Sequence, residues 1–348
     1  MSSIPTRRRR GILATGVVAI LGAVLVAAGC GDDDSTTTSG GGSGESGGKV
    51  DLVAYSTPET VYVEELEPAF EKTSGGSGVS FSNSFGASGD QSRAVEAGQP
   101  ASLVHLSLEP DMTRLVDAGI VSADWNKQKY NGIGQNSVVS LVTRAGNPEG
   151  IESFDDLLTK DVSVVTPNPF TSGGARWNIM AIYGSQIEAG KSEQEALDAV
   201  KTVLSKTEVQ PGSAADALTA FTQGQGDVLI SYENEAIRAQ NEGEDVDYVV
   251  PPSTILIETP IAVTEDAPES AQAFLDFLWS GEGQQIWADN GYRPVNPDLV
   301  DAKKYPTPSG LFTIDDLGGW EKIQTEFFDD QNGKIAVIEQ ELGVSTAG

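Results

Sequence analysis

Two short turns rich in serine and glycine carry the clearest chemical signal in the sequence. Residues 166–178 read Thr-Pro-Asn-Pro-Phe-Thr-Ser-Gly-Gly-Ala-Arg-Trp-Asn, so two prolines stop an apolar run and Ser172, Gly173 and Gly174 open a helical pattern. The N–H groups at a helix start have no partner within the helix and carry partial positive charge. The turn therefore predicts an anion site, although a plain serine N-cap would use the same residues.

A second turn repeats this arrangement nearer the N-terminus. Residues 86–93 read Gly-Ala-Ser-Gly-Asp-Gln-Ser-Arg and place Ser88 between a predicted strand and a predicted helix. This turn is no nucleophile elbow, because Asp90 stands where that motif requires glycine. Asp90 either faces the ligand, where it would accept a proton from a protonated anion, or stabilises its helix N-terminus. Two such turns suit a cleft that holds an anion from both sides.

Residues for nucleophilic catalysis are scarce. The chain has one cysteine, Cys30, and one histidine, His105, which lies in the apolar run 102–106 and is expected to be buried on a strand. A serine hydrolase that uses Ser88 or Ser172 is therefore the disfavoured alternative, since a base is missing. No clustered metal ligands occur, so neither a metal nor another cofactor is expected.

The charge balance limits the class of ligand. The 348 residues include 22 Lys+Arg and 51 Asp+Glu, for a formal net charge of −29. Nucleic acid is excluded as a partner, because no basic surface would offset phosphate charge. A buried anion is still compatible with this acidity, because distant surface charges are screened within about 10 Å at moderate salt and nearby backbone dipoles dominate.

The first fifty residues are typical of an exported protein. Four arginines precede residues 12–28, which carry no charge, and Ala27-Ala28-Gly29-Cys30 resembles a bacterial lipobox. We expect residues 1–29 to be a signal peptide, Cys30 to be lipidated, and residues 30–49 to be a flexible tether. The protein would then be extracytoplasmic and anchored to the cell membrane, with a retained transmembrane anchor as the alternative.

From Val50 onward, apolar runs alternate with amphipathic stretches. This alternation predicts α/β units with helices on both faces of largely parallel sheets, whose ligands lie where strands end and helices begin. The first helix is expected after residue 56, with Ser56 and Glu59 in capping-box spacing. The predicted strands are 50–54, 79–85, 102–106, 137–143, 162–166, 227–231 and 255–263, and the other predicted helices are 91–97, 110–118, 174–183, 193–205, 214–222 and 271–278.

Several stretches together resemble the periplasmic sulfate-binding proteins, the receptors of sulfate and thiosulfate ABC importers. They are residues 166–178, 226–236, 291–294, 311–314 and 318–320, in matching order. The resemblance implies a two-lobed periplasmic-binding-protein fold of type II with the ligand cleft between the lobes. It implies a monomer without enzymatic activity that delivers sulfate to ABC permease subunits. Lobe 1 would comprise residues 50–141 and 255–348, and lobe 2 residues 142–254.

The same resemblance implies a set of donors that touch the anion. A pocket of donors alone would select sulfate against protonated phosphate, because sulfate has no proton to give. Three residues depart from the family pattern, namely Ser56, Asp90 and Tyr232, and they keep molybdate or phosphate open as alternative ligands. A surface lipoprotein without a ligand would leave both turns unexplained. The implied ligand-binding residues are Ser56, Ser88, Ser172, Gly173, Gly174, Ala214 and Tyr232. Arg176 is expected to pair with an acid or with the helix stack, and Trp177 and Trp320 are expected to pack between the lobes.

Overall fold

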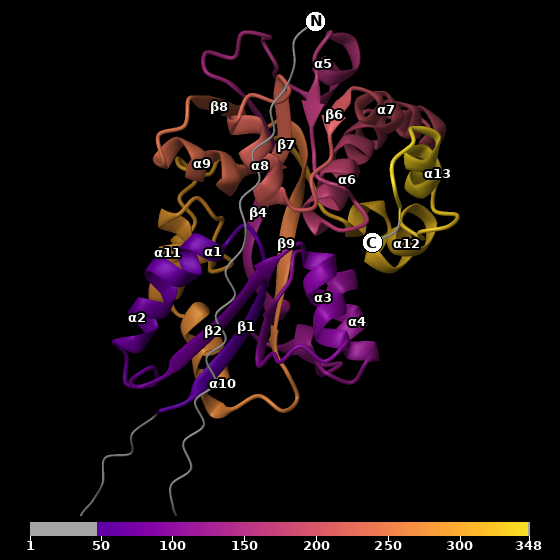
Figure 1. The fold of residues 1–348 in the computed structure, drawn as a ribbon. Helices are drawn as coiled ribbons and strands as arrows, with labels where there is room; N and C mark the ends of the chain where they lie inside the picture. The colour runs from indigo at the N-terminus through magenta and orange to yellow at the C-terminus, as the bar shows by residue number, and fades with distance from the viewer. Residues whose placement is uncertain (1–46, 347–348) are drawn as a thin grey trace, which may run out of the picture. The chain divides into compact units, whose positions relative to one another are not determined.

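The computed structural model describes residues 47–346. These residues lie within a compact unit that runs from Glu45 to Gly348. Helices and strands alternate along this part of the chain, and the strands join into a mixed sheet (Figure 1). None of the helices among residues 47–346 has the length and apolar character needed to span a bilayer.

The sheet has two parallel halves. In the first half, β1 (Lys49–Tyr55) lies between β2 (Ser80–Gly86) and β3 (Leu103–His105) and pairs in parallel with both. In the second half, β5 (Val164–Val165) lies between β6 (Thr207–Val209) and β7 (Val228–Tyr232), again in parallel. The predicted parallel pairing is therefore confirmed within each half. We use first half and second half for these two groups of strands and the helices packed on them.

Two long antiparallel strands join the halves. Strand β4 (Ile133–Arg144) pairs with β9 (Ser253–Val263) through residues 133–138, and residues 139–144 of β4 pair instead with β7 and β8 (Val246–Val249). Strand β9 also pairs antiparallel with β3 and parallel with β10 (Gly310–Phe312). The centre of the sheet is thus antiparallel, because β4 and β9 each continue from one half into the other.

The helices of the first half cover β1 to β3. The expected capping box at Ser56 and Glu59 is wrong, because the helix begins at Glu59 with Pro58 as its N-cap and no side-chain cap. A residue before proline is driven out of the helical region, so the helix cannot start before Pro58. The helices are α1 (Glu59–Val61), the π-helix η1 (Tyr62–Leu66), α2 (Glu67–Glu71), α3 (Ser88–Glu96), α4 (Glu109–Asp117), α10 (Glu269–Leu278) and α11 (Gly281–Asp289).

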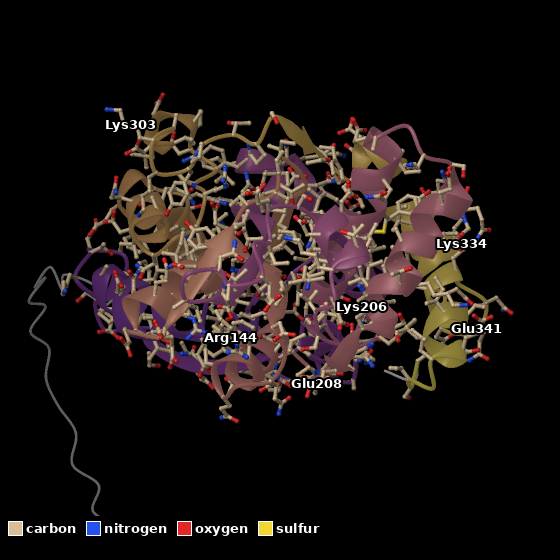
Figure 2. All side chains as sticks on the ribbon, turned by 90° about the horizontal axis from the view of Figure 1, so that it is seen from above. Arg144, Lys206, Glu208, Lys303, Lys334 and Glu341 are labelled. Carbon is tan, nitrogen blue, oxygen red and sulfur yellow. The ribbon has the colours of Figure 1, made fainter. Side chains whose placement is uncertain are left out.

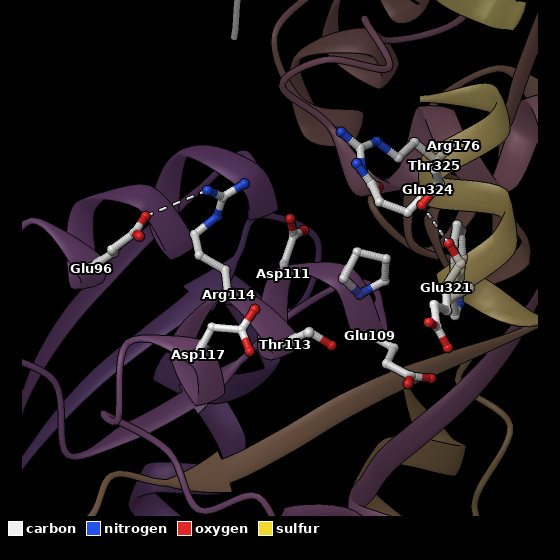
Figure 3. A pocket seen from close by; sticks show the side chains of 12 residues that line it. Glu96, Glu109, Asp111, Thr113, Arg114, Asp117, Arg176, Glu321, Gln324 and Thr325 are labelled. Atoms are coloured by element: carbon white, nitrogen blue, oxygen red, sulfur yellow. Dashed lines mark hydrogen bonds and ion pairs between the residues drawn. The ribbon is translucent and has the colours of Figure 1, made fainter. Parts of the chain in front are cut away.

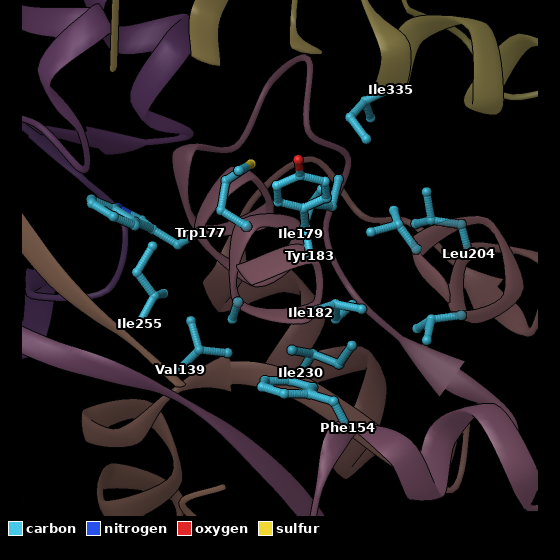
Figure 4. Close-up of a cluster of buried hydrophobic side chains, with 14 of the residues drawn as sticks. Val139, Phe154, Trp177, Ile179, Ile182, Tyr183, Leu204, Ile230, Ile255 and Ile335 are labelled. Atoms are coloured by element: carbon cyan, nitrogen blue, oxygen red, sulfur yellow. The ribbon is translucent and has the colours of Figure 1, made fainter. Parts of the chain in front are cut away.

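Helix α6 (Gly173–Glu188) forms the centre of the second half. Thirteen of its sixteen residues are buried, which is typical of a helix covered on all sides. Its apolar side chains meet Val139 and Ile230 of the sheet and Ile335 from the C-terminal region (Figure 4). The other helices are α5 (Phe154–Thr159), α7 (Glu193–Ser205), α8 (Ala214–Thr222), α9 (Glu233–Asn241), α12 (Gly319–Phe327) and α13 (Lys334–Glu341), with 3-10 turns η2 (Trp125–Lys127), η3 (Lys129–Gly132), η4 (Pro297–Leu299) and η5 (Asp315–Leu317).

The C-terminal helices pack on the second half. Lys334 at the start of α13 forms an ion pair of 2.5 Å with Glu193 of α7, and Lys201 of α7 forms one of 2.6 Å with Glu341. Lys334 and Glu341 both project from the same edge of the molecule (Figure 2). The expected boundaries assign residues 255–348 to lobe 1, whereas α13 packs beside α7, and Trp320 of α12 packs on Trp177 of α6. The division into lobes remains a prediction.

Candidate functional site

A small cavity lies between the first and second halves, where strands end and helices begin. Its volume, about 10 Å³ for the centre of a water-sized sphere, is far below the ~300–1,000 Å³ of sites for drug-sized ligands. The cavity therefore suits an ion of a few atoms. Its lining comprises Tyr55, Ser56, Ala87, Ser88, Ser107, Ser172, Gly173, Gly174, Ala214 and Tyr232. All seven residues named as ligand-binding from the sequence are in this set.

Four helices begin at this cavity. Ala87 is the N-cap of α3, Ser172 that of α6 and Tyr232 that of α9, and Ala214 is the first residue of α8. Each helix start carries roughly half a positive charge from its aligned peptide dipoles. The lining residues include no lysine, arginine or histidine. The positive potential that the lining itself supplies therefore comes from backbone dipoles.

The backbone N–H groups at these helix starts are available to a ligand. Those of Ser88, Gly173, Gly174 and Ala214 have no hydrogen-bond acceptor within residues 47–346. An unpaired buried N–H costs free energy, so a group that accepts all four would be strongly stabilised. An oxyanion supplies such acceptors.

Two neighbouring backbone N–H groups already donate to carbonyls of the protein, and one of these bonds joins the two halves. The Gly89 N–H donates to the carbonyl of Thr171 over 3.1 Å, and the Ser172 N–H donates to that of Asn168 over 2.9 Å. The first of these bonds joins the start of α3 to the turn before α6. The two serine-glycine turns therefore face each other across the cavity.

The hydroxyls of Ser172 and Ser88 have different surroundings. Ser172 Oγ accepts a 3.4 Å bond from the Ala175 N–H, and its own hydrogen has no acceptor within the described residues. Ser88 Oγ instead donates to Asp111 Oδ2 over 2.6 Å and accepts from the Ser107 N–H over 2.9 Å. Ser172 can therefore offer a hydroxyl to the ligand, whereas Ser88 can offer its N–H.

Ser107 was missed from the sequence, although it lines the cavity. Its Oγ lies 2.7 Å from the hydroxyl of Tyr232, and its carbonyl accepts a 2.8 Å bond from Trp177 Nε1. Ser107 follows β3 and precedes α4, so it occupies a junction of strand end and helix start. The expectation that ligands bind where a strand ends and a helix begins also applies to residues 106–109, so it could have identified Ser107.

Two glycines allow close approach of neighbouring residues. A Cβ added at Gly173 would lie 2.5 Å from Ser107 Oγ, and one added at Gly174 would lie 2.8 Å from Cε2 of Tyr232. Real Cβ atoms do not make contacts this short, so a side chain at Gly173 would push the halves apart and one at Gly174 would displace the Tyr232 ring within the second half. The free N–H groups of both glycines thus lie directly beside the two hydroxyls.

The charged side chains near the cavity point away from it. Asp90 Oδ1 lies 2.5 Å from Arg93 Nη2 and the Asp90 side chain is exposed, so the structure gives it the helix-stabilising role rather than the ligand-facing one. Arg176 donates to the carbonyl of Pro169 and to Gln324 Oε1. Arg176 lines a separate open groove of about 510 Å³ together with Asp111 (Figure 3). Trp177 and Trp320 pack edge to face, 4.7 Å apart.

The ionisable groups that line the cavity stay neutral. Burial raises the pKa of Tyr232 well above its usual value and also raises that of Tyr55, so both phenols keep their protons. Asp111 accepts from Ser88 Oγ but does not line the cavity, and burial raises the pKa of its carboxyl against the opposing charge of Arg176. The cavity therefore presents hydrogen-bond donors without a formal charge of either sign.

His105 does not serve as a base for either serine. It is fully buried, as predicted, and its Nδ1 lies 2.7 Å from the Tyr62 hydroxyl while its Nε2 lies 3.1 Å from Thr259 Oγ1. Because the Thr259 hydroxyl donates to the Gln135 carbonyl, Nε2 carries the imidazole hydrogen. Burial lowers the pKa of His105 to about 3. Within residues 47–346, no group of three or more His, Cys, Asp or Glu side chains is arranged to hold a metal.

Comparison with known proteins gives a consistent result. The family described as "Bacterial extracellular solute-binding protein" matches residues 50–293. The chain is 40% identical over 339 residues to a sulfate-binding protein of Synechococcus elongatus, covering 92% of this chain and 94% of the relative. It is 33% identical over 294 residues to a thiosulfate-binding protein of Pseudomonas aeruginosa, covering 80% and 88%.

Solved structures agree with this result. The sulfate-binding protein SubI from Mycobacterium tuberculosis shares 44% identity with the chain, with a TM-score of 0.78 over 81% of this chain and 99% of that one. A periplasmic thiamin-binding protein aligns with a TM-score of 0.61 at 15% identity, over 79% and 93% of the two chains. The second likeness shows the fold alone, and both place the chain in the periplasmic-binding-protein fold.

Proposed function

Because the chain belongs to the bacterial extracellular solute-binding proteins, in the sulfate- and thiosulfate-binding family, we propose that it captures sulfate outside the cytoplasm and delivers it to an ABC permease. The seven predicted ligand-binding residues would hold the anion in the small cavity between the halves. The chain would act as a receptor and catalyse no reaction.

The observation that carries this proposal is the convergence of unpaired donors without a cation. Four free N–H groups and the Ser172 hydroxyl face a space of ionic size. A fully deprotonated tetrahedral dianion can accept from all of them, whereas a protonated phosphate must also donate and would meet donors. Low local dielectric strengthens each of these bonds.

Closure of the halves would complete the site. Donors come from both halves, so the anion is fully surrounded only when the start of α3 lies against the turn before α6, as the Gly89–Thr171 bond has it. Strands β4 and β9 connect the halves and would act as the hinge, a common arrangement in proteins that close around a ligand. The closed form would then be the one delivered to the permease.

Calorimetric titration tests the ligand assignment. The compact unit of residues 45–348 should bind one sulfate, and competition with thiosulfate, molybdate and phosphate ranks the alternatives. Thiosulfate as the tightest ligand would move the chain to the other branch of its family. Phosphate or molybdate as the tightest ligand would overturn the sulfate assignment.

The membrane anchor rests on the sequence, since Cys30, the signal peptide 1–29 and residues 30–46 of the tether lie outside the described residues. Cys30 is the only cysteine and follows small residues after an apolar run. Cys30→Ser should leave the chain unprocessed or release it from the membrane, whereas Ser35→Ala in the tether should change nothing. A Cys30→Ser chain that is processed and held like wild type would contradict lipidation.

The lobe boundaries are also proposed. Residues 50–141 and 255–348 would form lobe 1 and residues 142–254 lobe 2, with the C-terminal helices packed on lobe 2 as α12 and α13 are here. The protein would function as a monomer, because one chain supplies every residue that lines the cavity. Sedimentation of the unit 45–348 at micromolar concentration would detect a dimer and contradict this.

A further inference from the structure

The hydroxyls of Ser107 and Tyr232 are bonded to each other in the cavity, and this bond leaves one of their two hydrogens without an acceptor among the described residues. Ser107 Oγ and the Tyr232 hydroxyl lie 2.7 Å apart, and either can be the donor. Each residue is only 1% exposed. Two hydroxyls carry two hydrogens and their mutual bond uses one. The other has no acceptor within residues 47–346.

The unused hydrogen lies beside free backbone donors of the cavity. Ser107 Oγ packs against the Cα of Gly173, and the Tyr232 ring and hydroxyl pack against that of Gly174. The N–H groups of these two glycines are among the free donors of the cavity. A ligand that accepts from both glycines would therefore lie within reach of the hydroxyl pair.

Both hydroxyls are positioned independently of their mutual bond. The backbone of Ser107 is fixed by its N–H, which donates to Ser88 Oγ, and by its carbonyl, which accepts from Trp177 Nε1. The Tyr232 ring is held beside Tyr55, with centroids 6.1 Å apart. Loss of either hydroxyl would therefore leave the other in place and free to rotate.

We propose that Ser107 and Tyr232 share a single hydrogen bond to the bound oxyanion. When Ser107 donates to Tyr232, the phenol donates to the ligand, and when Tyr232 donates to Ser107, the serine donates instead. Ser107 is therefore a ligand-binding residue of equal standing with Tyr232. This inference rests on the proposed function of the cavity as an oxyanion site.

The shared donor also couples binding to closure. Ser107 belongs to the first half and follows β3, whereas Tyr232 ends β7 in the second half. With the halves apart, each hydroxyl can bond to water and the pair does not exist. The pair forms only as the halves meet, so the remaining hydrogen is directed into the cavity by the same movement that encloses the anion.

A double-mutant cycle on the intact chain tests the proposal. Sulfate affinity is measured by calorimetry for wild type, Ser107→Ala, Tyr232→Phe and the double variant. Each single variant keeps one hydroxyl for the ligand and should lose only about threefold to tenfold in affinity. The double variant lacks the donor and should lose about tenfold or more beyond the product of the two single effects.

Other outcomes overturn the proposal. If the two hydroxyls only bond to each other, the double variant will bind as well as either single variant. If each contacts the ligand separately, the losses will multiply without excess. Ser92→Ala and Tyr305→Phe remove buried hydroxyls that bond to the carbonyls of Asp111 and Ala288, away from the cavity, and should leave affinity unchanged.

The proposal and the proposed function fail in distinguishable ways. Absence of sulfate binding by wild type contradicts the function, and the cycle is then run with whichever of thiosulfate, molybdate or phosphate binds tightest. Melting temperatures of all four proteins without ligand show whether a variant has lost its fold. A double variant that keeps the wild-type melting temperature and shows no excess loss contradicts the shared donor alone.

Discussion

Helices α3 and α6 begin on opposite sides of the cavity with similar residues, yet they contribute differently. At α6, Ser172 is the N-cap and keeps its hydroxyl hydrogen for the cavity, beside two glycines with free N–H groups. At α3, Ser88 is already inside the helix, and its hydroxyl turns inward to Asp111. The start of α6 therefore offers side-chain and backbone donors, whereas the start of α3 offers a backbone donor.

This difference shows how position at a helix start decides the role of a serine. An N-cap side chain folds back over the free N–H groups, so its hydroxyl points along the helix axis toward whatever binds there. A residue one position later carries its side chain on the helix surface, where it meets neighbouring elements. Variants that exchange or remove these groups should therefore have unequal effects in the two halves.

The largest expected effect follows from adding a methyl group at the start of α6. Gly173→Ala should lower sulfate affinity roughly a hundredfold, about 3 kcal/mol, because its Cβ would overlap Ser107 Oγ and the Leu108 side chain of the first half. Gly212→Ala is the matched control, since a Cβ there meets no atom within 4 Å. Equal calorimetric affinities for the two variants would show that the halves do not close over Gly173.

Removing the serine hydroxyls should lower sulfate affinity by a smaller factor, and by different factors for Ser172 and Ser88. Ser172→Ala removes a hydroxyl donor to a buried charged ligand and should cost about 1.5–3 kcal/mol in binding, or roughly ten- to hundredfold. Ser88→Ala should cost less than about tenfold in affinity but lower the melting temperature, because the buried Asp111 carboxylate loses its donor. The two readouts are titration and thermal unfolding. The reverse pattern would exchange the roles of the two helix starts.

Much of this arrangement could be predicted from the sequence, because the signals are local. Helices α7 and α8 match their predicted bounds of 193–205 and 214–222, where Ser192 and Ser213 cap a clear apolar period. The seven residues that the resemblance implies lie at ends of strands and starts of helices, and these junctions line one cavity.

The rest depends on partners distant in sequence. The sequence did not predict helix α9, because its buried glutamates have the composition of a surface segment. Glu233 is buried because its Oε2 pairs at 2.7 Å with Nε of Arg293, which is 60 residues away in the sequence. Strand β4 is longer than predicted because its polar Gln135 is buried and donates to the Tyr55 hydroxyl. The direction of the Ser88 hydroxyl likewise depends on Asp111, which no local pattern reveals.

The interior of the first half should also respond to pH through His105. The unfolded chain binds a proton at this residue near pH 6.5, whereas burial lowers the folded-state pKa to about 3. The unfolded state thus binds more protons below pH 6.5, and wild type should lose about 1.4 kcal/mol of stability for each pH unit below that value, down to pH 3.

His105→Gln provides the comparison for this loss. Urea unfolding of both proteins at pH 8, 6 and 4.5 removes the contribution of the other ionisable groups, because only the difference between the proteins is used. That difference should shrink steadily toward pH 4.5. A constant difference would mean that the imidazole takes up its proton equally in the folded and unfolded states, and the Tyr62 and Thr259 bonds would then need to be reassigned.

The smallest expected effect concerns Asp90, at the same helix start as Ser88. Its carboxylate pairs with Arg93 on the exposed side of α3, so it supplies no acceptor to the cavity. Asp90→Asn should therefore leave sulfate affinity within about twofold of wild type, since an exposed ion pair contributes only about 0–1 kcal/mol to stability and does not touch the ligand.

Sulfate affinity should also be independent of pH between 6 and 8 in both proteins. Sulfate does not titrate in this range, and the phenols that line the cavity keep their protons. Competition titrations with phosphate at pH 6 and 8 measure both points. A phosphate preference in wild type that disappears in Asp90→Asn would place the carboxylate beside the ligand, and the first half would then supply an acceptor where the second half supplies donors.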